Sequence, residues 1–278
     1  MPRSAKLKAA FAALALVIPL AWLAGAPAHA AKAPKASVAT PVIDGVWMIR
    51  EQYYLGQPLL PKPELTEAVK AQAAKHAAAQ AKGYVRTVGN MLCTPSGGPQ
   101  LFMMRSPFEI FHGFGRITFV FETEGSNQPR TVYMNEARQP PDIYPSFNGH
   151  SIGRWEGKTL VVDTVGFNGR GALLGPVPKS EKTHLIERFT WSADGKVMSD
   201  QITAEDPTTL VKPWTTTMVF DRMADTEERF EVWCEADLDA FKTLDLESLK
   251  DADPEVARML DPNERASDPA LKFAPPGK

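Results

Sequence analysis

The stretch GHSIGRWEGKTLVVDTVGFN, residues 149–168, decides the fold, because it predicts a tight β-hairpin. In residues 150–155 the side chains alternate in character with a period of two, as they do on the two faces of a strand. Glu156-Gly157-Lys158 supplies the turn, and residues 159–165 continue as a strand rich in β-branched residues. We expect this hairpin to lie at the centre of an antiparallel sheet.

Segments on both sides of the hairpin repeat this period of two residues. Residues 116–122 alternate cleanly, and residues 183–191, 196–205 and 214–222 follow the same pattern. No crossover helix follows these segments, which favours an antiparallel sheet over a parallel α/β sheet. About ten strands joined mostly in sequence suit a closed barrel or two packed sheets, since both protect strand edges. The predicted fold class is all-β, either an antiparallel β-barrel or a two-sheet sandwich.

Three shorter segments also read as strands. Residues 43–49 predict a first strand, whose Gly45-x-Trp47 resembles the opening of lipocalin-like barrels. Residues 100–104 follow a cluster of Pro and Gly residues and predict another strand, and residues 228–234 predict a last one. A lipocalin-like barrel is therefore one form of the all-β fold that the sequence allows.

Helical composition is confined to two places, which predicts one or two short peripheral helices. Residues 63–82 are rich in Ala, Glu, Lys and Gln, with Pro63 near the first turn and a glycine just past the end. After residue 236 the composition becomes charged and Pro-rich, with room for a short amphipathic helix in residues 244–260. We therefore expect a single β domain over residues 41–236, with a helical insertion near 63–82 and a C-terminal tail over 237–278.

The amino terminus predicts export. Residues 1–30 have the parts of a secretory signal: a basic start, an apolar stretch at 9–25 and the A-x-A cleavage site Ala28-His29-Ala30. An uncleaved membrane anchor is the alternative, but the apolar stretch is shorter than the roughly 20 residues that a bilayer needs. Residues 31–40, rich in Ala, Lys and Pro, predict a disordered linker. We expect a periplasmic or secreted protein with no stable membrane insertion after signal cleavage.

The charge of the chain bears on its partners, and its cysteine content bears on a disulfide. The chain has 31 Lys and Arg and 33 Asp and Glu, interspersed, so it lacks the basic surface typical of nucleic-acid binding, and we expect no nucleic-acid partner. Cys93 and Cys234 are its two cysteines, and an even count in an exported chain favours a disulfide. Two buried free thiols are the alternative.

The hairpin stretch also carries a resemblance. The pattern GHSIGRWEG-x-TLVVDT-x-GFN resembles a signature of an uncharacterised family of exported bacterial proteins. The similarity extends from Gly45-Val46-Trp47 through Cys93, residues 107–110 and His184 to Cys234. The resemblance implies export but no activity, because the family has no established one.

Known catalytic and cofactor motifs are absent from the chain. It contains no H-E-x-x-H, no Walker loop and no G-x-G-x-x-G, so no cofactor is predicted. Residues 149–153 match G-x-S-x-G in letters, but Ser151 lies inside a predicted strand and not at the strand-to-helix turn that this motif requires.

Four ionisable side chains share a predicted strand face with apolar neighbours: His112, His150, Asp163 and Glu187. If these faces point inward, the groups converge on one interior, where burial is costly unless a group is paired or used. We predict that His150, Asp163 and Glu187 face one interior cavity, with Arg154 at its wall. In the alternative, each group lies at a strand end or forms a structural ion pair with an arginine.

Histidines also raise the question of a metal. His184 and Glu187 are three residues apart, so on a strand they point to opposite faces and do not easily bind one ion. His112, His150 and His184 remain able to converge from different strands as a three-histidine site. Because the chain has no H-x-H pair and no C-x-x-C pair, we predict no metal.

The predicted function follows from these residues. We expect Phe119, Trp155 and Trp191, with His112 and His184, to line an internal pocket for a small apolar or aromatic molecule, although large rings are more often core. If the protein is an enzyme, cofactor-independent lyase, isomerase or hydrolase chemistry fits.

In that chemistry, His150 is the general base, Glu187 or Asp163 its partner, and Arg154 stabilises negative charge. The alternative function is a non-catalytic envelope protein that serves as a binding or structural module. The sequence leaves the ligand and the oligomeric state open.

Overall fold

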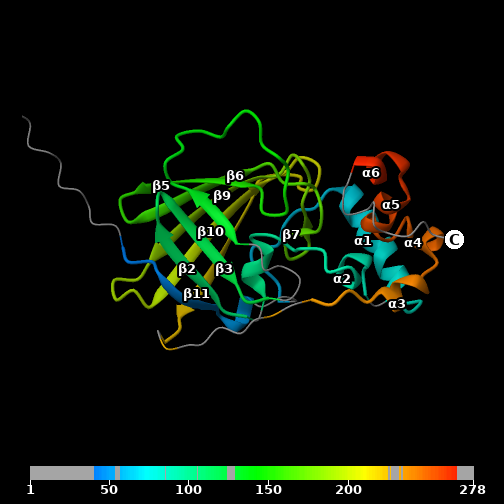
Figure 1. Cartoon of the computed structure of the whole chain (residues 1–278), viewed down its shortest axis with the longest axis horizontal. Helices are drawn as coiled ribbons and strands as arrows, with labels where there is room; N and C mark the ends of the chain where they lie inside the picture. Colours follow the sequence, from blue (N-terminus) through cyan, green and yellow to red (C-terminus); the bar gives the residue numbers. More distant parts are fainter. Residues whose placement is uncertain are drawn as a thin grey trace, which may run out of the picture. The chain divides into compact units, whose positions relative to one another are not determined.

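The structure, a computed structural model, has a closed β-barrel of nine strands within its described residues (Figure 1). The strands follow one another around the barrel as β1-β11-β10-β9-β6-β5-β4-β3-β2, and β1 closes it by pairing with both β11 and β2. The prediction of a β-barrel is thus confirmed, and the two-sheet sandwich is wrong. The described residues are 41–53, 57–84, 86–104, 106–123, 129–224, 226, 232 and 234–267.

Most strands lie where the sequence predicts them. The predicted signal sequence, the linker, most of the predicted strand 228–234 and residues 268–278 fall outside the described residues. A small separate sheet of two short strands was not predicted. The barrel strands are β1 (Gly45–Ile49), β2 (Phe108–Gly113), β3 (Arg116–Phe121), β4 (Arg130–Tyr133), β5 (His150–Glu156), β6 (Thr159–Val165), β9 (His184–Trp191), β10 (Val197–Glu205) and β11 (Trp214–Arg222), and the small sheet pairs β7 (Ala172–Leu174) with β8 (Val177–Pro178).

One strand pair departs from the predicted antiparallel order. Strands β4 and β5 run parallel, whereas the other barrel pairs among the described residues are antiparallel. A parallel pair needs a crossover connection, and residues 134–149 supply it without a helix. This crossover bonds to the end of β6, because Ser146 N donates to Gly166 O at 3.0 Å. Gln139 of the crossover also donates to Asp163 of β6, so the crossover lies against the hairpin.

The hairpin of β5 and β6 forms as predicted, with residues 156 and 159 paired across the turn. Gly157, the first of the two turn residues, has a φ of +63°, which a side chain would strain. Gly153 is needed for a different reason. A Cβ atom there would lie 2.5 Å from Sδ of Met134 and 2.6 Å from Cγ1 of Val132. The hairpin thus presents small residues where β4 packs most closely.

Phenylalanine rings fill much of the barrel interior. Phe102 lies at their centre, with its ring centroid 4.9–6.2 Å from five others. Its segment was predicted as a strand but is the 3-10 helix η2 (Gln100–Met103), whose residues are all buried. A strand buries alternate residues, so this short helix suits a segment that is apolar on all sides. The rings around Phe102 are those of Phe108, Phe119, Phe121, Phe189 and Phe220.

Buried residues from several short helices form a second hydrophobic cluster, and we call these helices the helical region. Helix α1 (Glu67–Gln80) lies inside the segment predicted to be helical. In its described part, residues 237–267, the C-terminal stretch predicted as a tail instead contains four helices, whose buried Phe241 and Val256 pack with Val88 and Met91 of α2. The remaining helices are η1 (Glu51–Tyr53), α2 (Val88–Met91), α3 (Leu238–Lys242), α4 (Leu246–Leu249), α5 (Pro254–Leu260) and α6 (Pro262–Ser267).

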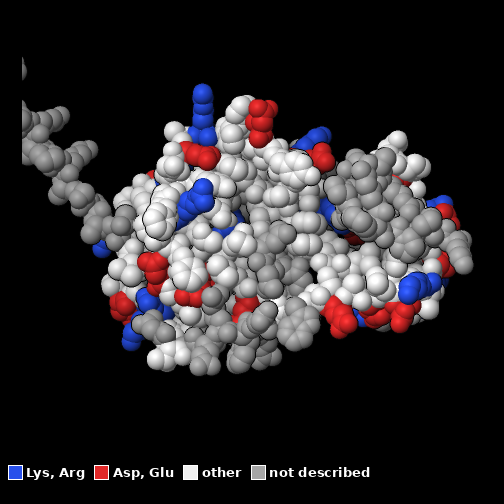
Figure 2. All heavy atoms as spheres, in the orientation of Figure 1, with Lys and Arg blue, Asp and Glu red and all other residues white. Residues whose placement is uncertain are grey.

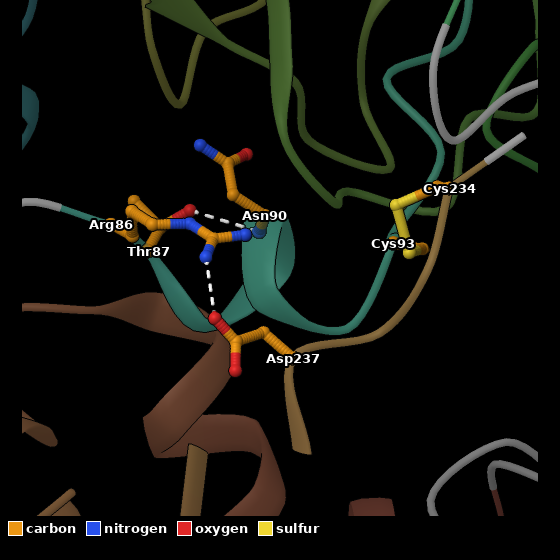
Figure 3. The surroundings of a disulfide bond; sticks show 6 residues. All are labelled: Arg86, Thr87, Asn90, Cys93, Cys234 and Asp237. Carbon is orange, nitrogen blue, oxygen red and sulfur yellow. Dashed lines mark hydrogen bonds and ion pairs between the residues drawn. A yellow bond between two sulfur atoms is a disulfide. The ribbon is translucent and has the colours of Figure 1, made fainter. Parts of the chain in front are cut away.

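A disulfide joins Cys93 to Cys234, as the sequence predicts, with 141 residues of sequence separation (Figure 3). Cys93 follows α2, and Cys234 precedes α3. Two further contacts tie the same segments together: Asp237 N donates to Met91 O at 2.9 Å, and Nη1 of Arg86 lies 2.7 Å from Oδ2 of Asp237. The disulfide thus attaches the C-terminal helices to α2.

Charged side chains of both signs are interspersed on the face of the molecule shown in Figure 2, in line with the mixed charge of the sequence. Among the described residues, every helix is too short or too polar to cross a bilayer.

Candidate functional site

The two faces of the hairpin carry different chemistry. Oγ of Ser151 lies 2.8 Å from Oγ1 of Thr164, so both side chains point to the same face, and both are buried in the barrel. His150 and Asp163 precede these residues by one position and therefore point outward. The side chain of Glu187 lies on the inner face instead. The prediction that His150, Asp163 and Glu187 share one interior cavity is thus wrong.

The outward side chains gather where β5, β6 and β9 lie side by side. Asp163 on β6 is opposite Ile152 on β5 and opposite Ile186 on β9. His150 and His184 each precede these isoleucines by two residues on the same face, so Asp163 lies between two histidines. We call His150, Asp163 and His184, with Gln139 from the crossover, the outer cluster.

His184 stands between two carboxylates. Its Nε2 lies 3.4 Å from Oδ2 of Asp163, and its Nδ1 lies 3.8 Å from Oε2 of Glu205 on β10. The side chains of His184 and Asp163 are 38% and 27% exposed. An imidazole beside a carboxylate, partly open to water, is an arrangement that general acids and bases use.

His150 is held by the crossover and by a stacked ring. Nε2 of Gln139 donates to the backbone oxygen and to Oδ1 of Asp163, both at 3.0 Å. Its Oε1 therefore faces Nδ1 of His150 at 2.9 Å and accepts that nitrogen's proton. The Tyr133 ring stacks on the imidazole at 4.9 Å. In the neutral ring, Nε2 of His150 is left as a proton acceptor, 3.6 Å from Oε2 of Glu136.

On the inner face, a buried polar network runs across five strands, and we call it the inner network. Arg130 on β4 donates from Nη2 to Ser151 Oγ at 3.4 Å and to Thr164 Oγ1 at 3.2 Å. Both Nη atoms of Arg130 also donate to the carboxylate of Glu187 on β9, with Nη1 at 2.7 Å from Oε1. Asp200 on β10 is the last member.

Asp200 is the unusual member of this network. It is fully buried, and neither carboxyl oxygen has a hydrogen-bond partner among the described residues. Burial raises the pKa of Asp200 well above its ordinary value; the charge of Glu187 raises it further, whereas Arg130 opposes the shift. One arginine thus faces two buried carboxyl groups, and the favoured state is a neutral Asp200 beside an ion pair of Arg130 and Glu187.

The other predicted site residues do not join the outer cluster. Arg154 is exposed, and its Nη2 pairs with Glu156 Oε1 at 2.7 Å, so it does not line an interior cavity. His112 is exposed at the end of β2. Of the predicted pocket-lining rings, Phe119 is a core residue that packs on Phe102, whereas Trp155 and Trp191 are partly buried and lie 5.9 Å apart against the core.

A three-histidine metal site does not form. Within the part of the chain that the structure describes, no group of three His, Cys, Asp or Glu residues is arranged to hold a metal ion. His112 lies at the end of β2, whereas His150 and His184 flank Asp163 on β5 and β9.

Sequence reasoning missed several residues of these two sites. Arg130 and Asp200 alternate with apolar residues, as Glu187 does, so the same signal was present for both. Gln139 carries no such signal, because it lies in an irregular connection.

Lys179, which belongs to neither site, was also missed: it is buried, and its Nζ donates to Ser96 O and Phe147 O at 2.5 and 3.1 Å. Burial lowers the pKa of Lys179 to about 7.

Comparison with known proteins adds no relative. The chain matches no protein-family model and no curated protein sequence.

Proposed function

We propose that the protein binds a small molecule at the outer cluster and transfers a proton to or from it. The observation that carries this proposal is the position of Asp163 between two histidines on a partly exposed face. Catalytic acids and bases need both a titratable group and access for the substrate. The outer cluster has both, whereas the inner network is closed to solvent.

The residues divide into roles by their contacts. His184 is the general base or acid, and Asp163 positions its ring. His150 is held in one tautomer by Gln139, so its Nε2 is the second group that can accept a proton. Positioned proton transfer of this kind typically accelerates a reaction by about 10²–10⁴-fold.

The surroundings of the outer cluster favour a ligand with an apolar or aromatic body. Ile152 and Ile186 lie beside Asp163 on the same face, and the Tyr133 ring stacks on His150. A flat apolar body can pack on these side chains while a polar group meets an imidazole. Isomerase, lyase and hydrolase reactions on such a molecule need only proton transfer from these residues.

Export is part of the proposal. The secretory signal in residues 1–30 supports it, and so does the disulfide between Cys93 and Cys234, because disulfides persist in oxidising compartments. Membership of the exported bacterial family that the signature resembles is likewise a proposal.

A second candidate function is a non-catalytic envelope module. One observation favours it: each ring nitrogen of His150 and His184 already faces a partner in the chain. In this alternative, the outer cluster holds the crossover on the barrel and no molecule binds there.

The test detects proton transfer by the incorporation of deuterium into a small molecule. Protein purified from its native host is incubated in deuterated water with the small-molecule extract of the same cells, and proton NMR and mass spectrometry detect altered or deuterated compounds. We expect conversion by the native protein, a loss of at least about 100-fold in His184→Asn, and no loss in the control His112→Asn, which changes an exposed histidine away from the cluster.

Two results would count against the proposal. One is an unchanged extract together with no co-purifying molecule, which favours the envelope module. The other is equal conversion by His184→Asn and the native protein, with folding of both checked by circular dichroism.

A further inference from the structure

The helical region contains an open groove, separate from the outer cluster. Its volume is about 700 Å³, within the usual range for small-molecule sites. One wall is a face of α1 with the turn that follows it, and the other comprises residues of α3, α4 and the chain between and after them. Met91 of α2 also lines the groove.

The groove exists because the wall on α1 is made of alanine. Lys75, Ala78 and Ala79 follow the spacing i, i+3, i+4 and so share one side of α1, and Lys82 follows in the turn after the helix ends at Gln80. None of the α1 side chains is buried, in contrast to a helix packed by leucine or isoleucine. Ala79 packs against the hydrophobic cluster, but methyl groups are too short to fill the space beside it, so a gap remains.

Hydrogen bonds hold α1 in place at both ends of this gap. Near its start, Nε2 of Gln72 donates to Asp251 O at 3.1 Å and to Ala252 O at 3.0 Å. Beyond its end, Tyr84 N donates to Ala79 O, and the hydroxyl of Tyr84 bonds to the carboxylate of Asp253. The helix is therefore fixed while the centre of the groove stays open.

The surface inside the groove is largely apolar. Met91 and Leu249 are buried residues of the hydrophobic cluster, and Leu244 packs against it. Together with Ala78 and Ala79 of the α1 wall, they form an apolar strip that lines the groove. Such a strip gains free energy when an apolar body replaces water, at roughly 25 cal/mol per Å².

The rim carries an excess of unpaired positive charge. Lys75 lies on α1 before the two alanines and Lys82 lies in the turn after the helix, and neither forms an ion pair within the described residues. Arg86 is neutralised by Asp237 at 2.7 Å. Asp251 is the remaining acidic residue of the lining, so the unpaired groups favour an anion.

We propose that this groove binds an anionic amphiphile, a molecule with an apolar body and one carboxylate, such as a medium-chain fatty acid. The body lies on Ala78, Ala79 and Leu249, and the carboxylate meets Lys75 or Lys82. This ligand class matches both the apolar strip and the charge of the rim.

The test uses three probes of one chain length on the full chain: dodecanoate, dodecanol and dodecyltrimethylammonium, each below the concentration at which it aggregates. Backbone amide NMR shifts report the site, and titration gives the affinity. We expect dodecanoate to bind most tightly and to shift the amides of Ala78, Ala79 and Leu249 rather than those of the barrel. The variant Lys75→Gln/Lys82→Gln should bind dodecanoate roughly fivefold to tenfold more weakly, with dodecanol unaffected.

Two variants on α1 separate groove filling from a general effect on the helix. Ala78→Phe puts a ring into the groove and should weaken dodecanoate binding at least about tenfold, as expected when a ligand's place is filled. Ala73→Phe, an exposed position five residues before Ala78 and outside the groove, is the matched control and should bind as the native chain does.

Three results would overturn the proposal. They are the absence of saturable dodecanoate binding, equal affinity for dodecanoate and dodecanol, and amide shifts confined to the barrel. The lysine variant keeps the test decisive if Ala78→Phe fails to fold, because Lys75 and Lys82 are exposed.

Discussion

Both faces of β5, β6 and β9 carry charged or titratable side chains, but those on the inner face are buried and those on the outer face are partly exposed. On the inner face, Arg130, Glu187 and Asp200 are at most 1% exposed. On the outer face, His150 and His184 are 20% and 38% exposed and lie beside carboxylates. In the inner network the charged groups contact one another and are closed to solvent. In the outer cluster the contacts are longer and open to water, which suits proton transfer more than stability.

Breaking the inner network should have the largest effect. Glu187→Gln leaves the guanidinium of Arg130 buried without its partner charge, and breaking a buried pair costs roughly 3–5 kcal/mol. We expect about 3 kcal/mol, the lower end of that range, because Asp200 lies close enough to ionise in its place. Urea unfolding measures the loss.

Glu156→Gln is the matched control for this prediction. It removes a carboxylate that also pairs with arginines, Arg154 and Arg188, but on the outer surface. We expect a far smaller loss of stability. Equal losses in the two variants would show that burial does not set the strength of the inner network.

The next effect is a dependence of stability on pH that comes from Asp200. Its pKa is raised in the folded protein above the value of about 3.9 in the unfolded chain. The folded protein therefore keeps a proton that the unfolded chain releases. The contribution of Asp200 to stability is fully present below about pH 4 and is lost as pH rises through the folded pKa, by up to about 1.4 kcal/mol per pH unit.

Asp200→Asn tests this dependence, because asparagine resembles the neutral acid and does not titrate. In urea unfolding across a pH series, the stability of the native protein relative to Asp200→Asn should fall with rising pH. Asp221→Asn should show the opposite sign, since a hydrogen bond from Arg50 lowers the pKa of Asp221 and this contribution is lost as pH falls. A difference that does not change with pH would mean that Asp200 is ionised in the fold.

The smallest effect belongs to the outer cluster. A double-mutant cycle with Asp163→Asn and His184→Asn should give a coupling of less than about 1 kcal/mol, because the pair is partly exposed. The coupling should shrink further in about 1 M salt, where screening is strong. A coupling as large as that between Arg130 and Glu187 would make the outer cluster a structural element.

The sequence predicted the barrel well because strand parity is a local property. Residues 150–165 formed the expected hairpin, and β11 matched its predicted segment from residue 214 to 222. Parity groups residues onto one face but does not say which face is inside. Both Val161 and Val162 are buried, although they point to opposite faces, since the outer surface of β6 is also covered. Sharing a strand face with apolar residues therefore did not show which face points into the barrel.

The candidate site was only half predictable for the same reason. His150, Asp163 and His184 were all singled out, and the structure brings them together on the outer face. Glu187 was grouped with them because it too alternates with apolar residues. The crossover that contributes Gln139 depends on a parallel strand pair formed between distant segments, and no local pattern encodes it.

The disulfide has a consequence for the covalent topology of the chain. Cys93 and Cys234 enclose β2 to β11, so every barrel strand except β1 lies within one covalent ring. A protease that cuts any single peptide bond inside that ring opens it without releasing a fragment. Under oxidising conditions the nicked molecule stays one covalent unit, and only cleavage together with reduction separates its pieces. A single cut in an exposed loop between Cys93 and Cys234 thus leaves the chain in one covalent piece, whereas a cut before Cys93 or after Cys234 releases a fragment.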